Sequence, residues 1–254
     1  MWQRFKRWLG YKFGGTSQPT PPVVTEPSEP TPINNVPVQP PIIVTPTTGG
    51  RVLDKVNNGT PRNPDHKFLY DNLVIDHDKL STVAWYCNQF DTNKARYTKV
   101  TNVTGVPEWF IFLLHIRECS LDFNKVLHNG QTLSHVNSYG TTWVPKGRGK
   151  GKHWTWEDAA FDALVLKKYH NKSSWALVDT LEDLEKWNGL GYRSRVGDKG
   201  VVEYSPFIVA GSAYHDETSK YVSDGKYDKY AKEKQLGVYV ILKGLEERGS
   251  VVLY

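Results

Sequence analysis

Val106–Asp122 reads VPEWFIFLLHIRECSLD, and this stretch decides the fold. Thr104 or Gly105 is suited to cap a helix that starts here, and Pro107 suits its first turn, where a missing N–H costs nothing. The residues that follow are apolar on every side of such a helix, which predicts a helix buried in the middle of a core. They are Trp109, Phe110, Ile111, Phe112, Leu113, Leu114 and Ile116.

The polarity changes in the last turn of this helix, where His115, Arg117 and Glu118 appear before Cys119 and Ser120. We therefore expect the helix to deliver the Glu118 carboxyl group to the edge of the core. Apolar surroundings disfavour its anion and the helix C-terminus carries partial negative charge, so both effects raise its pKa. A carboxyl group that keeps its proton near neutral pH is what general-acid cleavage of an ether-like bond requires. The alternative is an ordinary solvated Arg–Glu pair at a helix end.

Composition limits the domain organisation and the class of partner only broadly. At 254 residues the chain has room for one large domain or two small ones, and 39% hydrophobic residues are adequate for a core. A net charge of +5 favours anionic partners, and nine Trp suit stacking on sugars or bases as well as core packing. Cys87 and Cys119 are the only cysteines, and they predict buried thiols rather than a disulfide framework. We recognise no secretory signal and no apolar run of about 18 residues that could span a membrane.

Three segments are predicted along the chain. Residues 1–13 form a basic, aromatic, amphipathic peptide suited to an anionic membrane surface or a partner's groove, or else a disordered cationic tail. Residues 14–63 are a disordered Pro/Thr-rich linker and lead-in, because ten of the fifteen prolines fall between Pro19 and Pro46. Residues 64–254 form the globular domain.

The globular domain is predicted to be α+β and mostly helical. A capping box of Thr155 and Asp158 opens one helix, and Ser173 or Ser174 caps the next, which Gly189 follows. The Asn-Gly turn at 129–130 and the β-favouring stretch 136–144 predict a small β-hairpin or a long ordered loop. The predicted helices are His77–Tyr97, Val106–Cys119, Thr155–Tyr169, Ser173–Lys186 and Tyr230–Arg248, and the hairpin or loop is Leu127–Pro145.

An ordered series of short motifs runs through residues 64–248. It consists of TGVP at 104–107, RECSLDFN at 117–124, LHNG at 127–130, WTWEDAA at 154–160, DAL at 162–164, LEKWNGLGYRSR at 184–195, SPF at 205–207 and KYVSDG at 220–225. This series resembles lysozyme-superfamily proteins of phages and bacteria, which are related in fold to goose-type lysozymes and soluble lytic transglycosylases. The resemblance implies a lysozyme-like domain that cleaves the MurNAc–GlcNAc bond of peptidoglycan, with Glu118 as the general acid.

The resemblance also implies a substrate groove lined by residues 188–193. We expect Asn188, Gly189 and Arg193 to contact the glycan and Tyr192 to assist at the reacting centre, against ordinary packing or solvation of these side chains. Asn129 and Gln131 are expected to reach the groove from the predicted hairpin. The chain departs from the family pattern at Cys119, where many relatives have Ser, and at Phe207, Val209 and Ala213, which concern substrate contacts.

The sequence does not identify the second catalytic group. A retaining or inverting hydrolase uses a second carboxylate, whereas a lytic transglycosylase lets a hydroxyl of the sugar attack. Four acidic residues are available without a motif that singles one out. They are Asp122, Asp198, Glu203 and Asp216.

Two other functions compete with the glycosidase. His115 and Glu118 lie three apart on one helix face and could join His128, His135 or His153 in a metal-dependent hydrolase, although no His-Glu-x-x-His is present. A non-catalytic cell-wall-binding or virion structural protein could keep the same fold. The basic loop 146–153 lacks phosphate-loop spacing, so we expect a solvated loop and no specific nucleic acid.

The sequence thus predicts an enzyme with no cofactor and no metal that acts on peptidoglycan glycan strands. Residues 1–13 are expected to attach it to a membrane surface or a virion protein. A phage lysin or virion-associated enzyme of this kind works in the virion or, after release, in the host cell envelope.

Overall fold

The computed structural model describes residues 64–142, 145–194, 204–215, 218, 220–223 and 225–253, all of which belong to the compact unit Pro46–Tyr254. The predicted amino-terminal peptide 1–13 and the linker and lead-in 14–63 lie outside the described residues.

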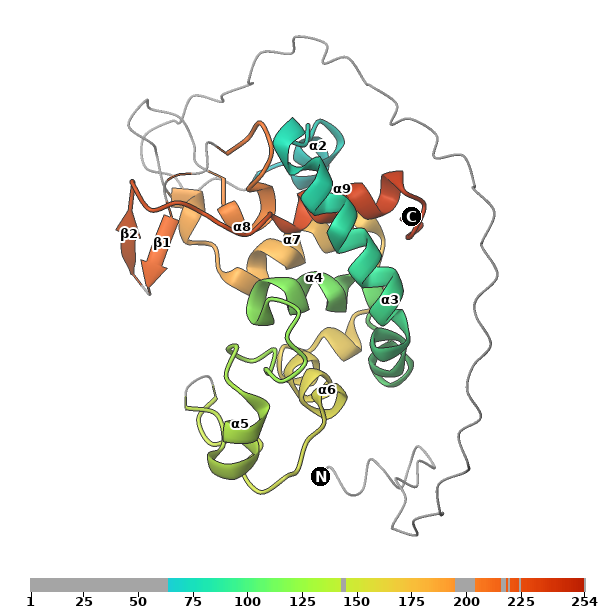
Figure 1. The fold of residues 1–254 in the computed structure, drawn as a ribbon, viewed down its shortest axis with the longest axis vertical. Helices are drawn as coiled ribbons and strands as arrows, with labels where there is room; N and C mark the ends of the chain where they lie inside the picture. Colours follow the sequence, from blue (N-terminus) through green and yellow to red (C-terminus); the bar gives the residue numbers. More distant parts are fainter. Residues whose placement is uncertain are drawn as a thin grey trace, which may run out of the picture. The chain divides into compact units, whose positions relative to one another are not determined.

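The described part is α+β and mostly helical, as predicted, with a single two-stranded antiparallel sheet (Figure 1). Its α-helices are α2 (His66–Asp71), α3 (Leu80–Thr104), α4 (Glu108–Cys119), α5 (Leu133–Tyr139), α6 (Trp156–Leu166), α7 (Leu177–Asn188), α8 (Pro206–Val209) and α9 (Val238–Glu247). Short 3-10 turns are η1 (His77–Lys79), η2 (Tyr169–Asn171) and η3 (Gly191–Ser194), and the strands are β1 (Lys220–Ser223) and β2 (Lys226–Asp228).

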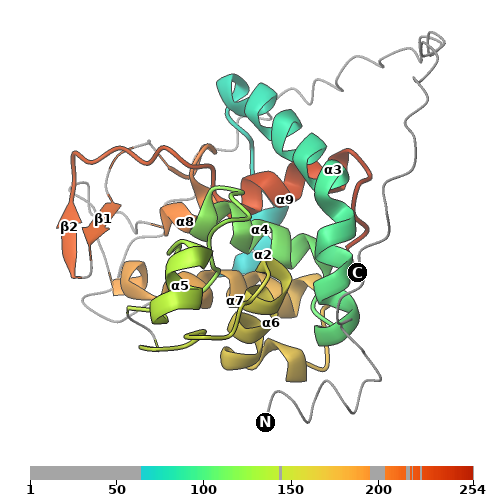
Figure 2. The same ribbon diagram turned by 60° about the horizontal axis from the view of Figure 1, so that its bottom comes forward.

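Helix α4 is the core helix that its sequence predicts. It lies in the middle of the other helices in both views, and every side chain from Trp109 to Ile116 is buried (Figures 1 and 2). Its start differs from the prediction, because Pro107 is the N-cap residue. Thr104 instead ends α3, and Gly105 follows as its C-cap with φ +72°. A left-handed residue at this position is the usual way to end a helix.

Helices α3 and α9 are the main neighbours of α4. Helix α3 packs against α4, α6 and α9, while α9 also packs against α4 and α8. Helix α7 packs against α2 and α8. Helix α3 is longer than predicted, because it continues past Tyr97 to Thr104 and buries Val100 in the core.

The predicted start of α6 is confirmed. The Thr155 hydroxyl accepts a hydrogen bond from Asp158 N at 3.2 Å, and the Asp158 carboxylate accepts one from Thr155 N at 3.1 Å. The helix ends at Leu166, earlier than predicted, since Lys168 has a φ of +65°.

Helix α7 continues two residues past its predicted end at Lys186, and Gly189 is its C-cap as predicted, but Ala176 is its N-cap and neither Ser173 nor Ser174 is. Helix α9 begins eight residues later than predicted. A carboxylate oxygen of Glu233 accepts hydrogen bonds from Lys234 N and Gln235 N. Such local side-chain bonds compete with helix formation.

The predicted position of the β-hairpin is wrong. Residues 133–139 form helix α5, because Val136 packs with Val126, Trp154 and Ala159 in a small second core. The Asn-Gly turn does form, with Gly130 at φ +69°, but only one isolated bridge, Lys125 to Thr132, flanks it. Tertiary packing thus overrides strand propensity.

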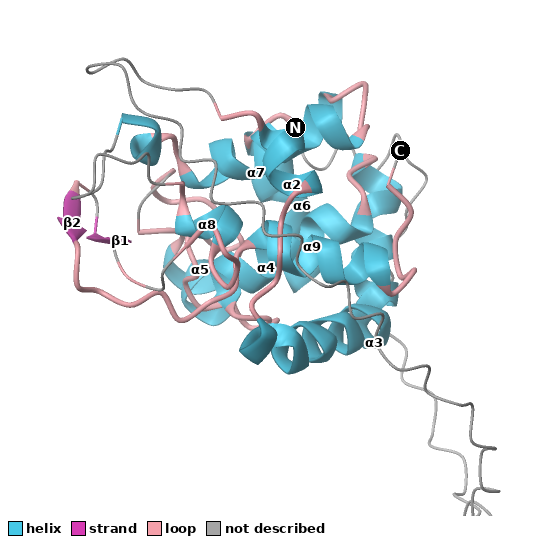
Figure 3. Cartoon of the chain, turned by 90° about the horizontal axis from the view of Figure 1, so that it is seen from above, coloured by secondary structure: helices cyan, strands magenta, loops and turns pink. Residues whose placement is uncertain are grey.

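The observed hairpin pairs β1 with β2, Lys220 opposite Asp228, and lies at the edge of the helical body (Figure 3). Cys87 and Cys119 are buried free thiols, as predicted. Within the described ranges, no helix is long and apolar enough to cross a membrane.

Replacing a fully buried ring of α4 tests whether this helix holds the domain together. Phe112→Ala should lower the free energy of unfolding by about 3–5 kcal/mol, because it removes an aromatic side chain that contacts Phe90 and Tyr97. The measurement is urea unfolding followed by circular dichroism. Tyr139→Ala removes an aromatic ring that is 72% exposed and should change stability by at most about 0.5 kcal/mol. Equal effects of the two substitutions would contradict a core built around α4.

Candidate active site

Glu118 occupies the last turn of α4 and is half-buried. The indole Nε1 of Trp187, from the last turn of α7, donates a hydrogen bond to its Oε1 at 2.9 Å. Ser120 then ends the helix in a left-handed conformation, with φ +52°. The carboxyl group therefore sits at the edge of the core, as its sequence position predicts, and one of its oxygens is fixed by a neighbouring helix.

The environment of Glu118 favours the protonated form. Burial raises the pKa of its carboxyl group, and this effect exceeds the opposing influence of the Trp187 N–H, Arg117 and Lys167, each of which favours the anion. The pKa of Glu118 therefore lies above its ordinary value of 4.5. Such a group carries its proton over a wider pH range than an exposed glutamate does.

The loop that carries Asn129 and Gln131 lies directly against the end of α4. A Cβ on Gly130 would lie only 2.6 Å from the Glu118 carbonyl oxygen, so this close approach requires glycine. Asn129 Nδ2 donates to Gln131 Oε1 at 2.7 Å, and the same oxygen accepts from Thr142 N at 2.8 Å. These predicted contact residues thus lie near Glu118, and their side chains brace the loop.

A cavity of about 470 Å³ flanks this end of α4. Three of the predicted site residues, Asn188, Gly189 and Tyr192, line it. Arg117 lines it too, whereas Glu118 is not one of its lining residues. The cavity therefore lies beside Arg117, the chain neighbour of Glu118, and the Glu118 carboxyl group is not part of its described wall.

Tyr192 connects the cavity wall to the hairpin. Its ring is buried, and its hydroxyl oxygen accepts a hydrogen bond from Tyr221 N in β1 at 2.9 Å. Burial raises the pKa of Tyr192 to about 12, so its hydroxyl is neutral near pH 7. In this arrangement the hydroxyl holds β1 against η3, and its predicted role at the reacting centre stays a prediction.

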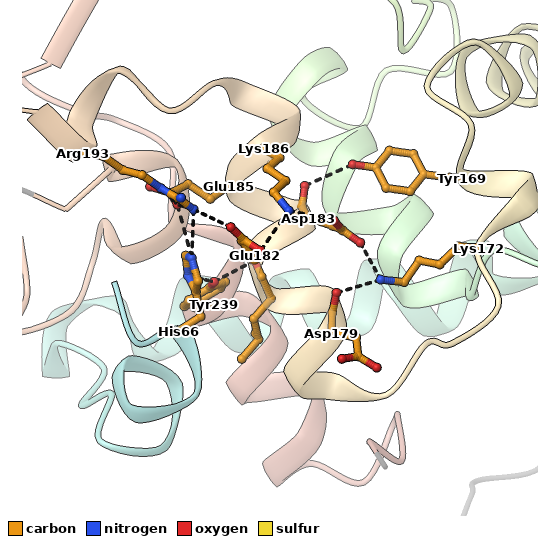
Figure 4. Close-up of polar contacts among 11 residues, drawn as sticks. His66, Tyr169, Lys172, Asp179, Glu182, Asp183, Glu185, Lys186, Arg193 and Tyr239 are labelled. Carbon is orange, nitrogen blue, oxygen red and sulfur yellow. Dashed lines mark hydrogen bonds and ion pairs between the residues drawn. The ribbon is translucent and has the colours of Figure 1, made fainter. Parts of the chain in front are cut away.

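Arg193 is directed to α7 rather than along the cavity (Figure 4). Its Nη2 lies 2.7 Å from Glu185 Oε2 and 3.1 Å from Glu182 Oε1. His66 of α2 joins the same group, with Nε2 3.3 Å from Glu185 Oε2. The guanidinium therefore fastens η3 to α7, and with it the segment that carries Gly189 and Tyr192.

A second ionic contact holds the segment between η2 and α7 against α7. Lys172, just after η2, pairs with Asp183 and donates a hydrogen bond to the Asp179 carbonyl at 2.7 Å (Figure 4). Tyr169 donates to the Asp183 carbonyl at 3.2 Å. Helix α7 is thus fixed along its length, and Trp187 at its end is placed with it.

Of the candidates for a second carboxylate, only Asp122 is described, because Asp198, Glu203 and Asp216 lie outside the described residues. Asp122 accepts a hydrogen bond from Asn124 N at 2.8 Å, which closes a turn. The structure adds a carboxylate that the sequence analysis missed, Glu233, which lines the cavity. No motif marks it, since its place depends on contacts across more than 100 residues of chain.

The histidines of the metal hypothesis have separate partners. His115 Nδ1 lies 3.0 Å from the Tyr97 hydroxyl in the core, and His128 Nε2 lies 2.9 Å from Asp162 Oδ2. Arg148 of the basic loop also contacts Asp162, at 2.6 Å from Nε to Oδ2. In the part of the chain that the structure describes, no three His, Cys, Asp or Glu side chains are arranged to hold a metal ion.

Comparison of the chain with protein-family models, with curated proteins and with solved structures finds no match.

The raised pKa of Glu118 has a consequence for stability. A group whose pKa is higher in the folded state stabilises the fold at acid pH, and this contribution is lost as the pH rises through the folded-state pKa. Glu118→Gln, which is neutral at every pH, should therefore gain stability relative to the unsubstituted protein as the pH rises from the acid range through the folded-state pKa of Glu118. The measurement is the free energy of unfolding in urea as a function of pH.

Asp122→Asn is the matched control one turn further along. The Asn124 N–H lowers the pKa of Asp122, so this substitution should show the opposite trend and lose relative stability as the pH rises. Parallel pH curves for the two variants would contradict the difference in environment between these carboxyl groups.

Proposed function

We propose that this chain is a peptidoglycan-degrading enzyme with a lysozyme-like domain, which cleaves the MurNAc–GlcNAc bond with Glu118 as general acid. The observation that carries the proposal is the position of Glu118. It ends a helix whose residues from Trp109 to Ile116 are all buried, its pKa is raised by burial, and its chain neighbour Arg117 lines a cavity of about 470 Å³. The ordered motif series of the sequence supports the same proposal.

The chemistry starts with one proton transfer. The Glu118 carboxyl group gives its proton to the glycosidic oxygen while the bond from that oxygen to the sugar's C1 breaks. Positive charge develops on the sugar in an oxocarbenium-like transition state. The Trp187 N–H then stabilises the carboxylate that Glu118 has become, at the stage where this charge appears.

The product depends on the nucleophile that attacks C1. Water gives a reducing end, as in a hydrolase, and a hydroxyl of the same sugar gives an anhydro end, as in a lytic transglycosylase. Residues 1–13 are proposed to attach the enzyme to a membrane surface or a virion component.

One observation favours a second candidate function. Glu118 does not line the cavity and already accepts a hydrogen bond from Trp187. A cell-wall-binding or virion structural protein with this fold would bind glycan in the cavity without turnover.

The acid is tested directly by substitution. Glu118→Gln keeps the shape of the side chain and removes the transferable proton, so turnover of purified peptidoglycan should fall by about 10²–10⁴-fold. Mass spectrometry of the released fragments distinguishes reducing from anhydro ends. Glu108→Gln, at the opposite end of α4, is the matched control and should retain activity, because Glu108 is half-buried beside Thr98 and does not line the cavity.

Three outcomes would count against the proposal. Equal turnover by the Glu118 and Glu108 variants would remove Glu118 from the reaction. Binding to sacculi without turnover by the unsubstituted protein would support the structural protein. Loss of activity in EDTA would support a metal-dependent hydrolase.

The hydrogen bond from Trp187 should set the upper pH limit of activity. Trp187→Phe removes an N–H that stabilises the Glu118 anion, so the pKa of Glu118 should rise further and the alkaline limb of the kcat/KM profile should move to higher pH. Trp154→Phe, in the small second core, controls for the loss of a buried indole and should leave the limb in place. A shift to lower pH in the Trp187 variant would contradict this role.

A further inference from the structure

The cavity that Arg117 lines has an excess of positive charge among its described lining residues. Arg117 and Lys220 are its cations, and Glu233 is the only carboxylate of that described set. Glu233 Oε2 lies 3.7 Å from Arg117 Nη2 and 3.6 Å from Lys220 Nζ, so one anion is shared by two cations. One positive charge is left without a counterpart in this lining.

Arg117 is built into the wall. Its side chain is 8% exposed, its Nη1 donates to the Leu236 carbonyl at 3.1 Å, and its guanidinium lies 4.9 Å from the ring centre of Phe207. Its Nε is buried and has no hydrogen-bond partner among the described residues. The guanidinium is thus a fixed positive charge in the wall, held there by its contacts with Leu236 and Phe207.

Glu233 is an anion that cannot neutralise both cations. Burial alone would raise its pKa, but Arg117, the Gln235 N–H and Lys220 together hold the pKa below its ordinary value. The carboxylate is therefore ionised at neutral pH, and the excess positive charge among the described lining residues persists. A cavity with such an excess favours a ligand with a negative charge.

The other walls suit a sugar. Phe207, Tyr192 and Tyr221 provide aromatic surface, and Asn188 and Ser223 provide hydrogen-bonding groups. Pockets with apolar walls and a few polar groups are typical small-molecule sites.

We propose that this cavity binds an acidic amino sugar through its carboxylate, with Arg117 and Lys220 as the residues that recognise the anion. The inference rests on the proposed function, because it identifies the MurNAc side of the strand as the part that the cavity beside Arg117 binds. The carboxylate is either that of the lactyl ether of MurNAc or that of its stem peptide. Only one of them is present on a given MurNAc, because the stem peptide is attached by an amide bond to the lactyl carboxyl group; a MurNAc without the peptide offers the lactyl carboxylate, and one with it offers a carboxylate of the peptide.

The test is a binding measurement on the full chain carrying Glu118→Gln, which prevents turnover. Isothermal titration calorimetry compares the disaccharide GlcNAc–MurNAc, the same disaccharide with a stem tripeptide, and chitobiose, which has no carboxylate. At least one of the acidic ligands should bind on the order of tenfold tighter than chitobiose, because charge-assisted hydrogen bonds are the stronger ones. The tighter of the two acidic ligands identifies the source of the carboxylate. This preference should shrink as salt is added.

Lys220 allows a graded substitution with a matched control. Lys220→Gln should reduce the preference for the acidic ligand and Lys220→Glu should abolish it, while binding of chitobiose stays within about twofold. Lys226→Gln removes an exposed cation from β2 that does not line the cavity, and it should leave the preference unchanged.

Equal binding of acidic and neutral ligands, no binding of either, or equal effects at Lys220 and Lys226 would overturn the inference. Failure of the proposed function looks different. In that case the acidic ligand still binds and depends on Lys220, but the unsubstituted protein releases no fragments from peptidoglycan.

Discussion

The hydrogen bond from Trp187 to Glu118 joins the two helices on which the site depends. Helix α4 brings the carboxyl group out of the core, and α7 brings a donor to it, the indole N–H of Trp187 at 2.9 Å. Because Trp187 is itself packed on Tyr169, the donor has little freedom to move. The position of the acid therefore depends on how firmly α7 is held.

The ionic contacts of α7 hold this helix in place. Glu182 and Glu185 face Arg193 and His66, and Asp183 faces Lys172. Glu185 and His66 are buried, so removing one partner would leave a charged or polar group without compensation, which is more costly than the pair is stabilising. This arrangement fastens α2, η2 and η3 to one helix, and η3 in turn places Tyr192 at the cavity.

The sequence was most informative where a local rule decides the structure. The all-round apolar character of α4, the capping box of α6 and Gly189 at the end of α7 follow from side chains close together in the chain, and each was predicted correctly. The hairpin was misplaced because its assignment depended on strand propensity, which Val136 overcame by packing into the small second core. Asp224-Gly225 is a hairpin signal that the sequence analysis did not use.

In the site, too, local sequence predicts some features, whereas contacts between distant segments determine others. The position of Glu118 follows from the periodicity of one helix, but the partners of Arg193 and the presence of Glu233 in the cavity do not, because they depend on contacts between distant segments. Arg193 was expected to bind substrate because it lies in a motif. Its guanidinium instead donates hydrogen bonds to Glu182 and Glu185, which lie one helical turn apart on α7. Local sequence does not reveal such a partner.

The last turn of α4 separates two chemical roles by helix geometry alone. Consecutive residues on a helix point about 100° apart. Arg117 therefore faces the cavity while Glu118 faces Trp187, although they are neighbours in the chain. If both pointed the same way, the guanidinium would pair with the carboxylate and lower its pKa further than it now does. Glu233 reinforces the separation, because it gives Arg117 a different anion to pair with. The same carboxylate that neutralises part of the cavity thus also helps to keep the acid protonated.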